Sequence, residues 1–140
     1  MEDFFENWAA QPALTDADAA SLAEACRTVL DMKKGQDIAV ICVTGRSDVT
    51  DYLVLCSATS STHVSALAGE LEYRLEQRGV KPLHTDGGNA RNWRVLDYVT
   101  VMVHIFDREA REFYNLDKLY REAPAAAKTE GEPREGKSEA

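Results

Sequence analysis

One stretch of the sequence decides the fold: Trp93–Phe106, which has the sequence WRVLDYVTVMVHIF. Valine, isoleucine, phenylalanine, tyrosine and threonine predominate in it, and these residue types favour β-structure. The stretch is too long for one typical strand of about 5–6 residues. We therefore predict two strands joined as a hairpin that turns at Tyr98-Val99-Thr100, although no glycine marks the turn.

Two amphipathic helices are predicted before this hairpin. The first is expected to begin at Thr15 and to stop at Gly35, and the second to follow Thr59-Ser60-Ser61 and to end at Gly79. Both repeat apolar residues at i, i+3, i+4 and i+7, as a helix with one buried face does. The repeating residues are Leu22, Cys26, Val29 and Leu30 in the first helix, and Val64, Leu67, Ala68, Leu71 and Leu75 in the second.

Three short segments indicate further strands. Asp37–Val43 and Tyr52–Cys56 are apolar and rich in β-branched residues, which is typical of buried strands. Val80–His84 contains a proline and is expected to form a short strand at the edge of the sheet. Together with the helices, these segments predict an α/β fold with a mixed β-sheet packed against helices.

The chain ends with a last helix and a polar tail. Asp107 is expected to cap this helix, whose core-facing residues would be Ala110, Phe113 and Tyr114, with Leu119 as a further candidate. After Glu122 the large apolar residues stop. We therefore predict an irregular lead-in at 1–14, in which Trp8 can pack on the body or on a partner, one domain at 15–121, and a disordered charged tail at 122–140.

Composition limits the classes of function. The 140 residues include 16 Lys and Arg against 24 Asp and Glu, a net charge of −8. This balance disfavours direct reading of nucleic acid and favours contact with a basic protein. No apolar run approaches the ~20 residues of a membrane span, and the acidic N-terminus is unlike a signal peptide, so a cytoplasmic protein is expected. The cysteines Cys26, Cys42 and Cys56 are interpreted as buried free thiols.

Candidate catalytic groups are weak. Asp48 and Asp51 follow a Gly-x-Ser loop, but their Asp-x-x-Asp spacing would place them on opposite faces of a strand, whereas two-metal nucleotidyl transfer needs both on one face. The segment Ser57–Thr62 can offer a helix N-terminus to an anion, but N-capping explains it and no P-loop lysine follows. The histidines are scattered without a partner at i+4. No metal or cofactor site is predicted.

Two residues of the hairpin stand out. His104 lies inside a strand, where a buried histidine needs a hydrogen-bond partner, so a structural role is favoured over a catalytic one. Trp93 opens the hairpin after a glycine-rich loop, and both a core and an interface position are open to it.

Several blocks of the chain, in order from about Ser21 to Tyr120, resemble the RsfS/Iojap family of ribosomal silencing factors. The blocks are Asp37-Ile38-Ala39-Val40, Thr50-Asp51-Tyr52, Ala58-Thr59-Ser60-Ser61-Thr62-His63-Val64, Trp93-Arg94-Val95-Leu96-Asp97-Tyr98, Val103-His104-Ile105-Phe106 and Arg111-Glu112-Phe113-Tyr114-Asn115-Leu116-Asp117-Lys118-Leu119-Tyr120. Many members have Gly-Asp at the hairpin turn, where this chain has Val99-Thr100.

The resemblance implies a fold similar to nucleotidyltransferases without their active site, and a protein that is not an enzyme. It implies binding to the large ribosomal subunit through ribosomal protein fourteen, which blocks association with the small subunit and represses translation when nutrients are limited. Homodimers are also implied. The partner-binding residues would be Trp93, Leu96, Asp97, Tyr98 and His104. A nucleotide-binding or nucleotidyltransferase-like enzyme and a ribosome-assembly adaptor remain the alternative interpretations.

Overall fold

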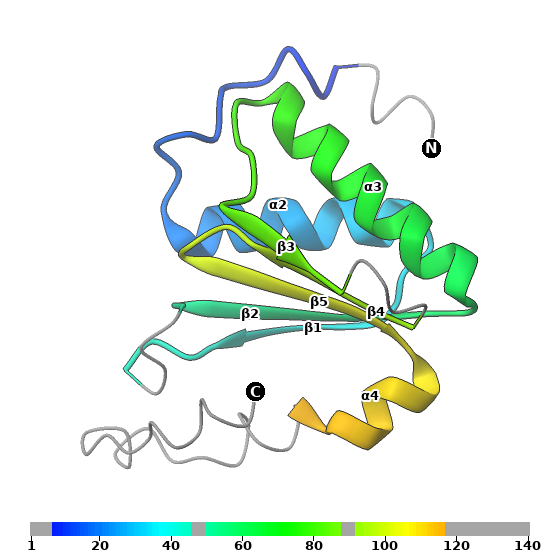
Figure 1. Ribbon diagram of the computed structural model, residues 1–140. Helices are drawn as coiled ribbons and strands as arrows, with labels where there is room; N and C mark the ends of the chain where they lie inside the picture. Colours follow the sequence, from blue (N-terminus) through cyan, green and yellow to red (C-terminus); the bar gives the residue numbers. More distant parts are fainter. Residues whose placement is uncertain (1–6, 46–49, 88–91, 117–140) are drawn as a thin grey trace.

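The sheet of this computed structural model, which describes residues 7–45, 50–87 and 92–116, has five strands in the order β1-β2-β5-β4-β3 (Figure 1). β2 and β5 are parallel, and the other neighbouring strands are antiparallel. The predicted mixed α/β sheet is therefore confirmed. The strand bounds are Gln36–Cys42 for β1, Tyr52–Ala58 for β2, His84–Asp86 for β3, Trp93–Asp97 for β4 and Val101–Asp107 for β5.

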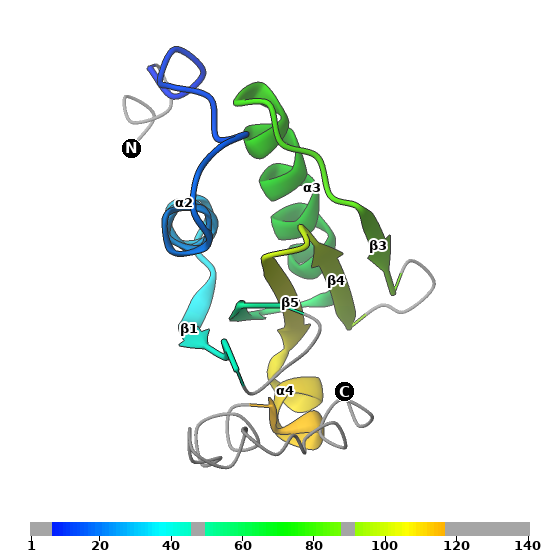
Figure 2. The ribbon, with the colours of Figure 1, turned by 90° about the vertical axis from the view of Figure 1, so that its left-hand side faces the viewer.

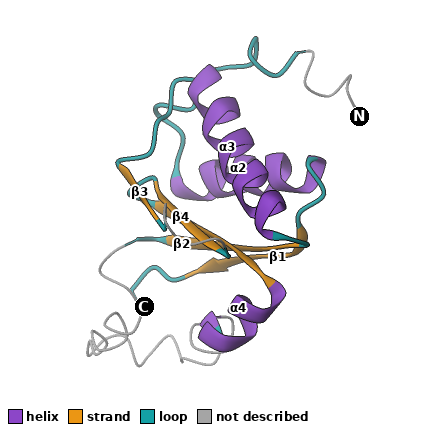
Figure 3. Ribbon diagram, turned by 45° about the vertical axis from the view of Figure 1, so that its right-hand side comes forward, coloured by secondary structure: helices purple, strands orange, loops and turns teal. Residues whose placement is uncertain are grey.

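Within the described residues, three helices cover the sheet from two sides. α2 (Ala19–Met32) and α3 (Ser61–Gln77) pack on one face, whereas α4 (Arg108–Tyr114) lies on the other (Figures 1 and 3). Viewed from the side, the long helices form one layer and the strands a second, with α4 beneath them (Figure 2). The two faces of the sheet are therefore covered by elements of very different length.

Side-chain caps set where each helix begins. Ser60 accepts a hydrogen bond from the His63 backbone N–H at 3.1 Å, and Asp107 accepts one from the Ala110 N–H at 2.8 Å, both as predicted. The predicted start of the first helix at Thr15 is wrong, since α2 begins after Asp18. The Asp18 carboxylate, on extended backbone, accepts from the N–H three residues on and satisfies a donor that the helix cannot.

The predicted edge strand at Val80–His84 is also wrong, because β3 covers only its last residue and continues to Asp86. The backbone N–H of Val80 bonds to the Leu75 carbonyl, which completes the end of α3 after Gly79 turns the chain at a φ of +90°. Val80 therefore belongs to the end of α3, and Pro82 has no N–H to offer a strand.

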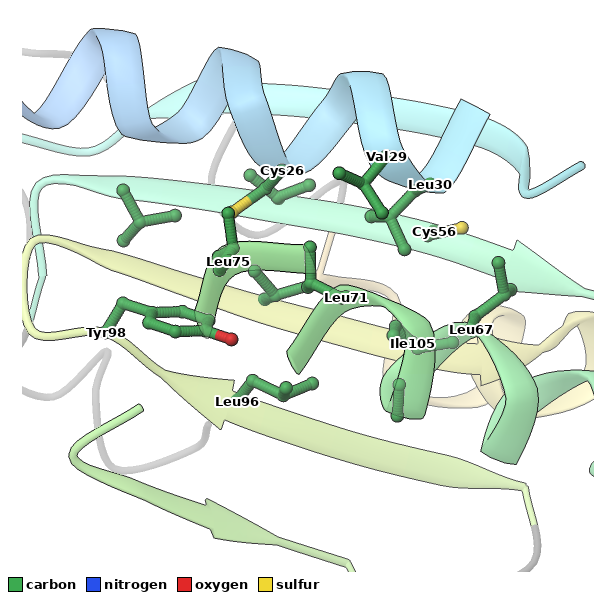
Figure 4. Packing of buried hydrophobic residues seen from close by; sticks show 14 of the residues in the cluster. Cys26, Val29, Leu30, Cys56, Leu67, Leu71, Leu75, Leu96, Tyr98 and Ile105 are labelled. Atoms are coloured by element: carbon green, nitrogen blue, oxygen red, sulfur yellow. The ribbon is translucent and has the colours of Figure 1, made fainter. Parts of the chain in front are cut away.

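Two hydrophobic clusters lie on the two faces of the sheet. The larger one joins α2 and α3 to the sheet (Figure 4), and the smaller one lies between the sheet and α4. Cys26 and Cys56 are buried as expected, but Cys42 is exposed on the edge strand β1. Ala110 is buried as expected, whereas Phe113 is 79% exposed. α4 is too short to bury more than one narrow stripe.

The lead-in packs on the body of the domain from Asn7 onward. Trp8 is buried, its indole Nε1 donates to the Arg74 carbonyl at 2.8 Å, and the Arg78 guanidinium lies 4.4 Å from the ring centroid. Leu14 is also buried and donates its N–H to the Arg78 carbonyl at 2.8 Å. Residues 7–14 thus form a strap, without helix or strand, across the C-terminal end of α3. The predicted tail at 122–140 lies outside the described residues.

Candidate partner-binding surface on β4 and β5

The candidate surface lies on the face of the sheet opposite α2 and α3. Successive side chains of a strand point to opposite faces, so Trp93, Val95 and Asp97 share one side of β4, and Arg94 and Leu96 share the other. Leu96 packs into the cluster beneath α2 and α3, whereas Trp93 packs against the cluster on the α4 face. Of the five residues predicted to bind a partner, the alternation therefore separates Leu96 from Trp93.

Trp93 is half-buried and is tied to His104 on the neighbouring strand. Its indole Nε1 donates a hydrogen bond to His104 Nδ1 at 3.3 Å. The two rings stack with centroids 6.0 Å apart and an interplanar angle of 17°. His104 stacks in turn on Phe106 with centroids 6.0 Å apart and an angle of 26°. Three aromatic rings thus follow one another across β4 and β5.

His104 lies beneath this surface rather than on it, with 5% of its area exposed. Burial lowers the pKa of His104 from 6.5 to about 4, because a charged imidazolium would lose its hydration there. The ring is therefore neutral at physiological pH and keeps one N–H. Because the indole Nε1 of Trp93 can only donate, the hydrogen bond between them assigns the acceptor to Nδ1 and the proton to Nε2 of His104.

The loop before β4 fixes where Trp93 begins the strand. Arg94 donates from Nη1 to the Gly87 carbonyl at 2.9 Å and from Nη2 to the Ser65 hydroxyl at 3.1 Å, so it ties this loop to α3. Gly87 has a φ of +86°, and a Cβ there would lie 2.5 Å from the Trp93 carbonyl oxygen. Only glycine allows the chain to pass so close to the start of β4.

Asp97 closes the other end of β4. Its carboxylate Oδ1 accepts from the backbone N–H of Val99 at 2.9 Å, and Oδ2 lies 3.9 Å from Nδ1 of His84 on β3. The side chain keeps 14% of its area exposed. Asp97 therefore stabilises the turn and still presents a carboxylate at the surface.

Leu96 and Tyr98 do not reach the surface. Leu96 is 1% and Tyr98 5% exposed, and both side chains lie among those of α2 and α3 (Figure 4). Burial raises the pKa of the Tyr98 hydroxyl, which has no hydrogen-bond partner among the described residues. The expectation that these two residues touch a partner directly disagrees with their burial, and we interpret them as core residues that shape the hairpin.

Two exposed aliphatic residues next to Asp97 were missed by the sequence reasoning. Leu83 is 68% exposed and donates its N–H to the Asp97 carbonyl at 2.7 Å, and Val99 is 55% exposed in the turn. Val99 has a φ of +77°, where a β-branched side chain is strained. A valine in a turn position that favours glycine was the signal available in the sequence.

The candidate anion-binding segment before α3 has a structural role, and Asp51 takes part in backbone hydrogen bonds to Val43 and Thr100. Ser60 caps α3, and His63 accepts a hydrogen bond from the Thr59 N–H at 3.0 Å. Asp48 lies outside the described residues. Within the described ranges, no group of three His, Cys, Asp or Glu is placed to hold a metal ion, and none of the helices there is long and apolar enough to cross a membrane.

The fold is that of a known class of small α/β domains with a mixed sheet. A crystal structure of a protein from Chromobacterium violaceum superposes with a TM-score of 0.71 at 21% identity, covering 74% of this chain and 86% of that one. One from Bacillus halodurans gives a TM-score of 0.65 at 28% identity, covering 72% of this chain and 94% of the other.

Within this class, the family model described as "ribosomal silencing factor during starvation", RsfS, matches residues 16–140, and the chain belongs to that family. The ribosomal silencing factor RsfS of Haemophilus influenzae is 39% identical over 71% of this chain and 98% of its own length. That of Bacillus subtilis is 31% identical over 76% of this chain and 90% of its own. A mouse protein named "mitochondrial assembly of ribosomal large subunit protein 1" is 30% identical over 66% of this chain and 42% of its own. The resemblance found in the sequence is thereby confirmed.

Proposed function

We propose that this chain silences translation by binding the large ribosomal subunit through its protein number fourteen. The bound chain prevents the small subunit from joining and so represses translation in the cytoplasm when nutrients are limited. Membership of the ribosomal silencing factor family supports a role at the ribosome. The observation that supports a direct protein contact is the half-buried indole of Trp93, held on the face of the sheet opposite the two long helices.

The proposed contact surface has an aromatic anchor and a charged end. Trp93 supplies a large, rigid ring, of the kind that dominates binding energy at protein interfaces. Leu83 and Val99 add exposed aliphatic area around the Asp97 carboxylate. With a net charge of −8, the chain is attracted to a basic ribosomal protein and repelled by bare rRNA. The mechanism is steric and requires no catalytic group or cofactor.

Co-sedimentation with purified large subunits tests this surface. We expect the wild-type chain to bind, and Trp93→Ala to lower affinity at least about 30-fold, the effect of losing a hot spot of about 2 kcal/mol. Tyr73→Ala is the matched control, because Tyr73 is an aromatic residue 56% exposed on α3, on the opposite side of the sheet. An equal loss of affinity in Trp93→Ala and Tyr73→Ala, or no binding of the wild type at low salt, would rule out the proposed contact surface.

A second function on the same surface is ribosome assembly. The name of the mouse relative, which refers to assembly of the large subunit, supports this candidate. Sedimentation of cell extracts separates the two functions: a silencing factor is found on mature large subunits, and an assembly factor only on immature precursors. Homodimer formation, which the family resemblance implies, is tested by sedimentation velocity over a range of concentrations.

A further inference from the structure

His104 and Trp93 are joined diagonally across two antiparallel strands. In the register of β4 and β5, His104 lies opposite Val95, and Trp93 lies opposite Phe106. Diagonal neighbours on one face are within reach of aromatic side chains. The indole therefore extends along the sheet to meet the imidazole, which explains how a hydrogen bond of 3.3 Å and a near-parallel ring pair coexist.

His104 and Trp93 differ in burial, which suggests that the two residues have different roles. His104 is 5% exposed and has little area to offer a partner, whereas Trp93 is half-buried and keeps part of its area exposed. A buried polar ring must find hydrogen-bond partners, and the indole N–H supplies one of them. The imidazole also stacks on Phe106, which is fully buried, with ring centroids 6.0 Å apart.

We propose that His104 is a positioning residue, which fixes the indole of Trp93 by an acceptor at Nδ1 and by ring stacking, so that the exposed part of Trp93 is presented in one orientation. This inference rests on the proposed function, in which Trp93 contacts the ribosomal partner. A side chain already fixed in its bound orientation loses less conformational entropy on binding, so the positioning raises affinity without any contact from His104 itself.

Asparagine and leucine at position 104 test the acceptor, because both side chains have four heavy atoms branched at Cγ and only asparagine has an oxygen, Oδ1, that can take the place of His Nδ1. The first readout is exchange of the Trp93 indole N–H with solvent by NMR, its signal assigned with Trp93→Phe. We expect exchange at least about tenfold faster in His104→Leu than in the wild type, and substantial recovery in His104→Asn. We expect affinity for large subunits to fall about three- to tenfold in His104→Leu, as when one hydrogen bond is lost, and to recover partly in His104→Asn.

Unchanged indole exchange in His104→Leu would overturn the positioning role, whatever happens to ribosome binding. The proposed contact surface fails separately, when Trp93→Ala binds as tightly as the wild type, and the exchange measurement remains valid in that case. If His104→Leu does not fold, the wild-type chain still decides: its imidazole nitrogen spectrum at neutral pH must show Nδ1 unprotonated and perturbed by Trp93→Phe. A protonated Nδ1, or one that does not respond, contradicts the proposal.

Discussion

Asp97 holds the backbone of Val99 through a hydrogen bond of 2.9 Å from the Val99 N–H to its carboxylate, at a φ of +77° that valine rarely adopts. The turn between β4 and β5 therefore depends on a side chain rather than on a glycine. The same carboxylate faces the proposed contact surface, so this residue pair links the stability of the hairpin to the charge that a partner meets.

Val99→Gly should stabilise the domain by about 1 kcal/mol, because glycine adopts a positive φ without the clash of a Cβ. Val99 is 55% exposed, so little buried area is lost. Thermal denaturation should show a melting temperature higher by a few degrees. Val99→Ala is the control, since alanine keeps the Cβ and the strain. A lower melting temperature for Val99→Gly would show that the turn is not strained.

Asp97→Asn should distinguish the role of Asp97 in the turn from the role of its negative charge in binding. Asparagine keeps an oxygen that can accept from the Val99 N–H, so the free energy of unfolding should change by less than about 1 kcal/mol. Binding to large subunits should weaken and become less sensitive to salt, because one negative charge is lost at the contact. Asp97→Ala should also lower stability, since the turn loses its acceptor. An Asp97→Asn chain that binds as tightly as the wild type at every salt concentration would exclude Asp97 from the contact.

His104 should make stability depend on pH in the acid range. Its pKa is lowered from 6.5 to about 4 by burial, so the folded chain binds fewer protons at this site than the unfolded chain between these two values. The contribution to stability is present above about pH 6.5 and is lost as the pH falls to about 4, at most about 3 kcal/mol in total. Denaturant unfolding should show a shallower pH dependence in His104→Asn than in the wild type. Equal slopes would contradict the burial of a neutral histidine.

Trp8→Ala should destabilise the domain by about 3–5 kcal/mol, as large truncations in a core do. Trp8→Phe should cost less, since it keeps most of the ring area and loses the hydrogen bond to the Arg74 carbonyl. Urea unfolding measures both. Below the melting temperature, Trp8→Phe should bind large subunits like the wild type, because the strap packs on α3, on the opposite side of the sheet from Trp93. A strap variant with normal stability and lost binding would place Trp8 in the contact.

The features that depend on local sequence could be predicted. The hairpin that turns at Tyr98-Val99-Thr100 and the caps at Ser60 and Asp107 depend on neighbouring residues, and all three are confirmed. The errors come from tertiary packing. Phe113 fits a helical pattern but lies on a helix too short to bury it, and Cys42 lies in an apolar segment that turned out to be an edge strand.

The position of the candidate residues in the fold could be predicted at the level of the strand, but not for each side chain. The Trp-led strand and its neighbour do place Trp93, Asp97 and His104 on one face, but alternation along β4 sends Leu96 to the other face, into the core. The pairing of Trp93 with His104 required the register of β4 and β5, which a single sequence does not contain. The contact with a ribosomal partner remains a prediction.

Light scattering of subunit association tests the central claim most directly. Purified small and large subunits are mixed with the wild-type chain, with Trp93→Ala or with Tyr73→Ala, and the rise in scattering reports joining. The proposed function predicts that the wild type and Tyr73→Ala suppress the rise, and that Trp93→Ala leaves it close to that of subunits alone. Normal association in the presence of saturating wild-type chain would contradict the silencing mechanism.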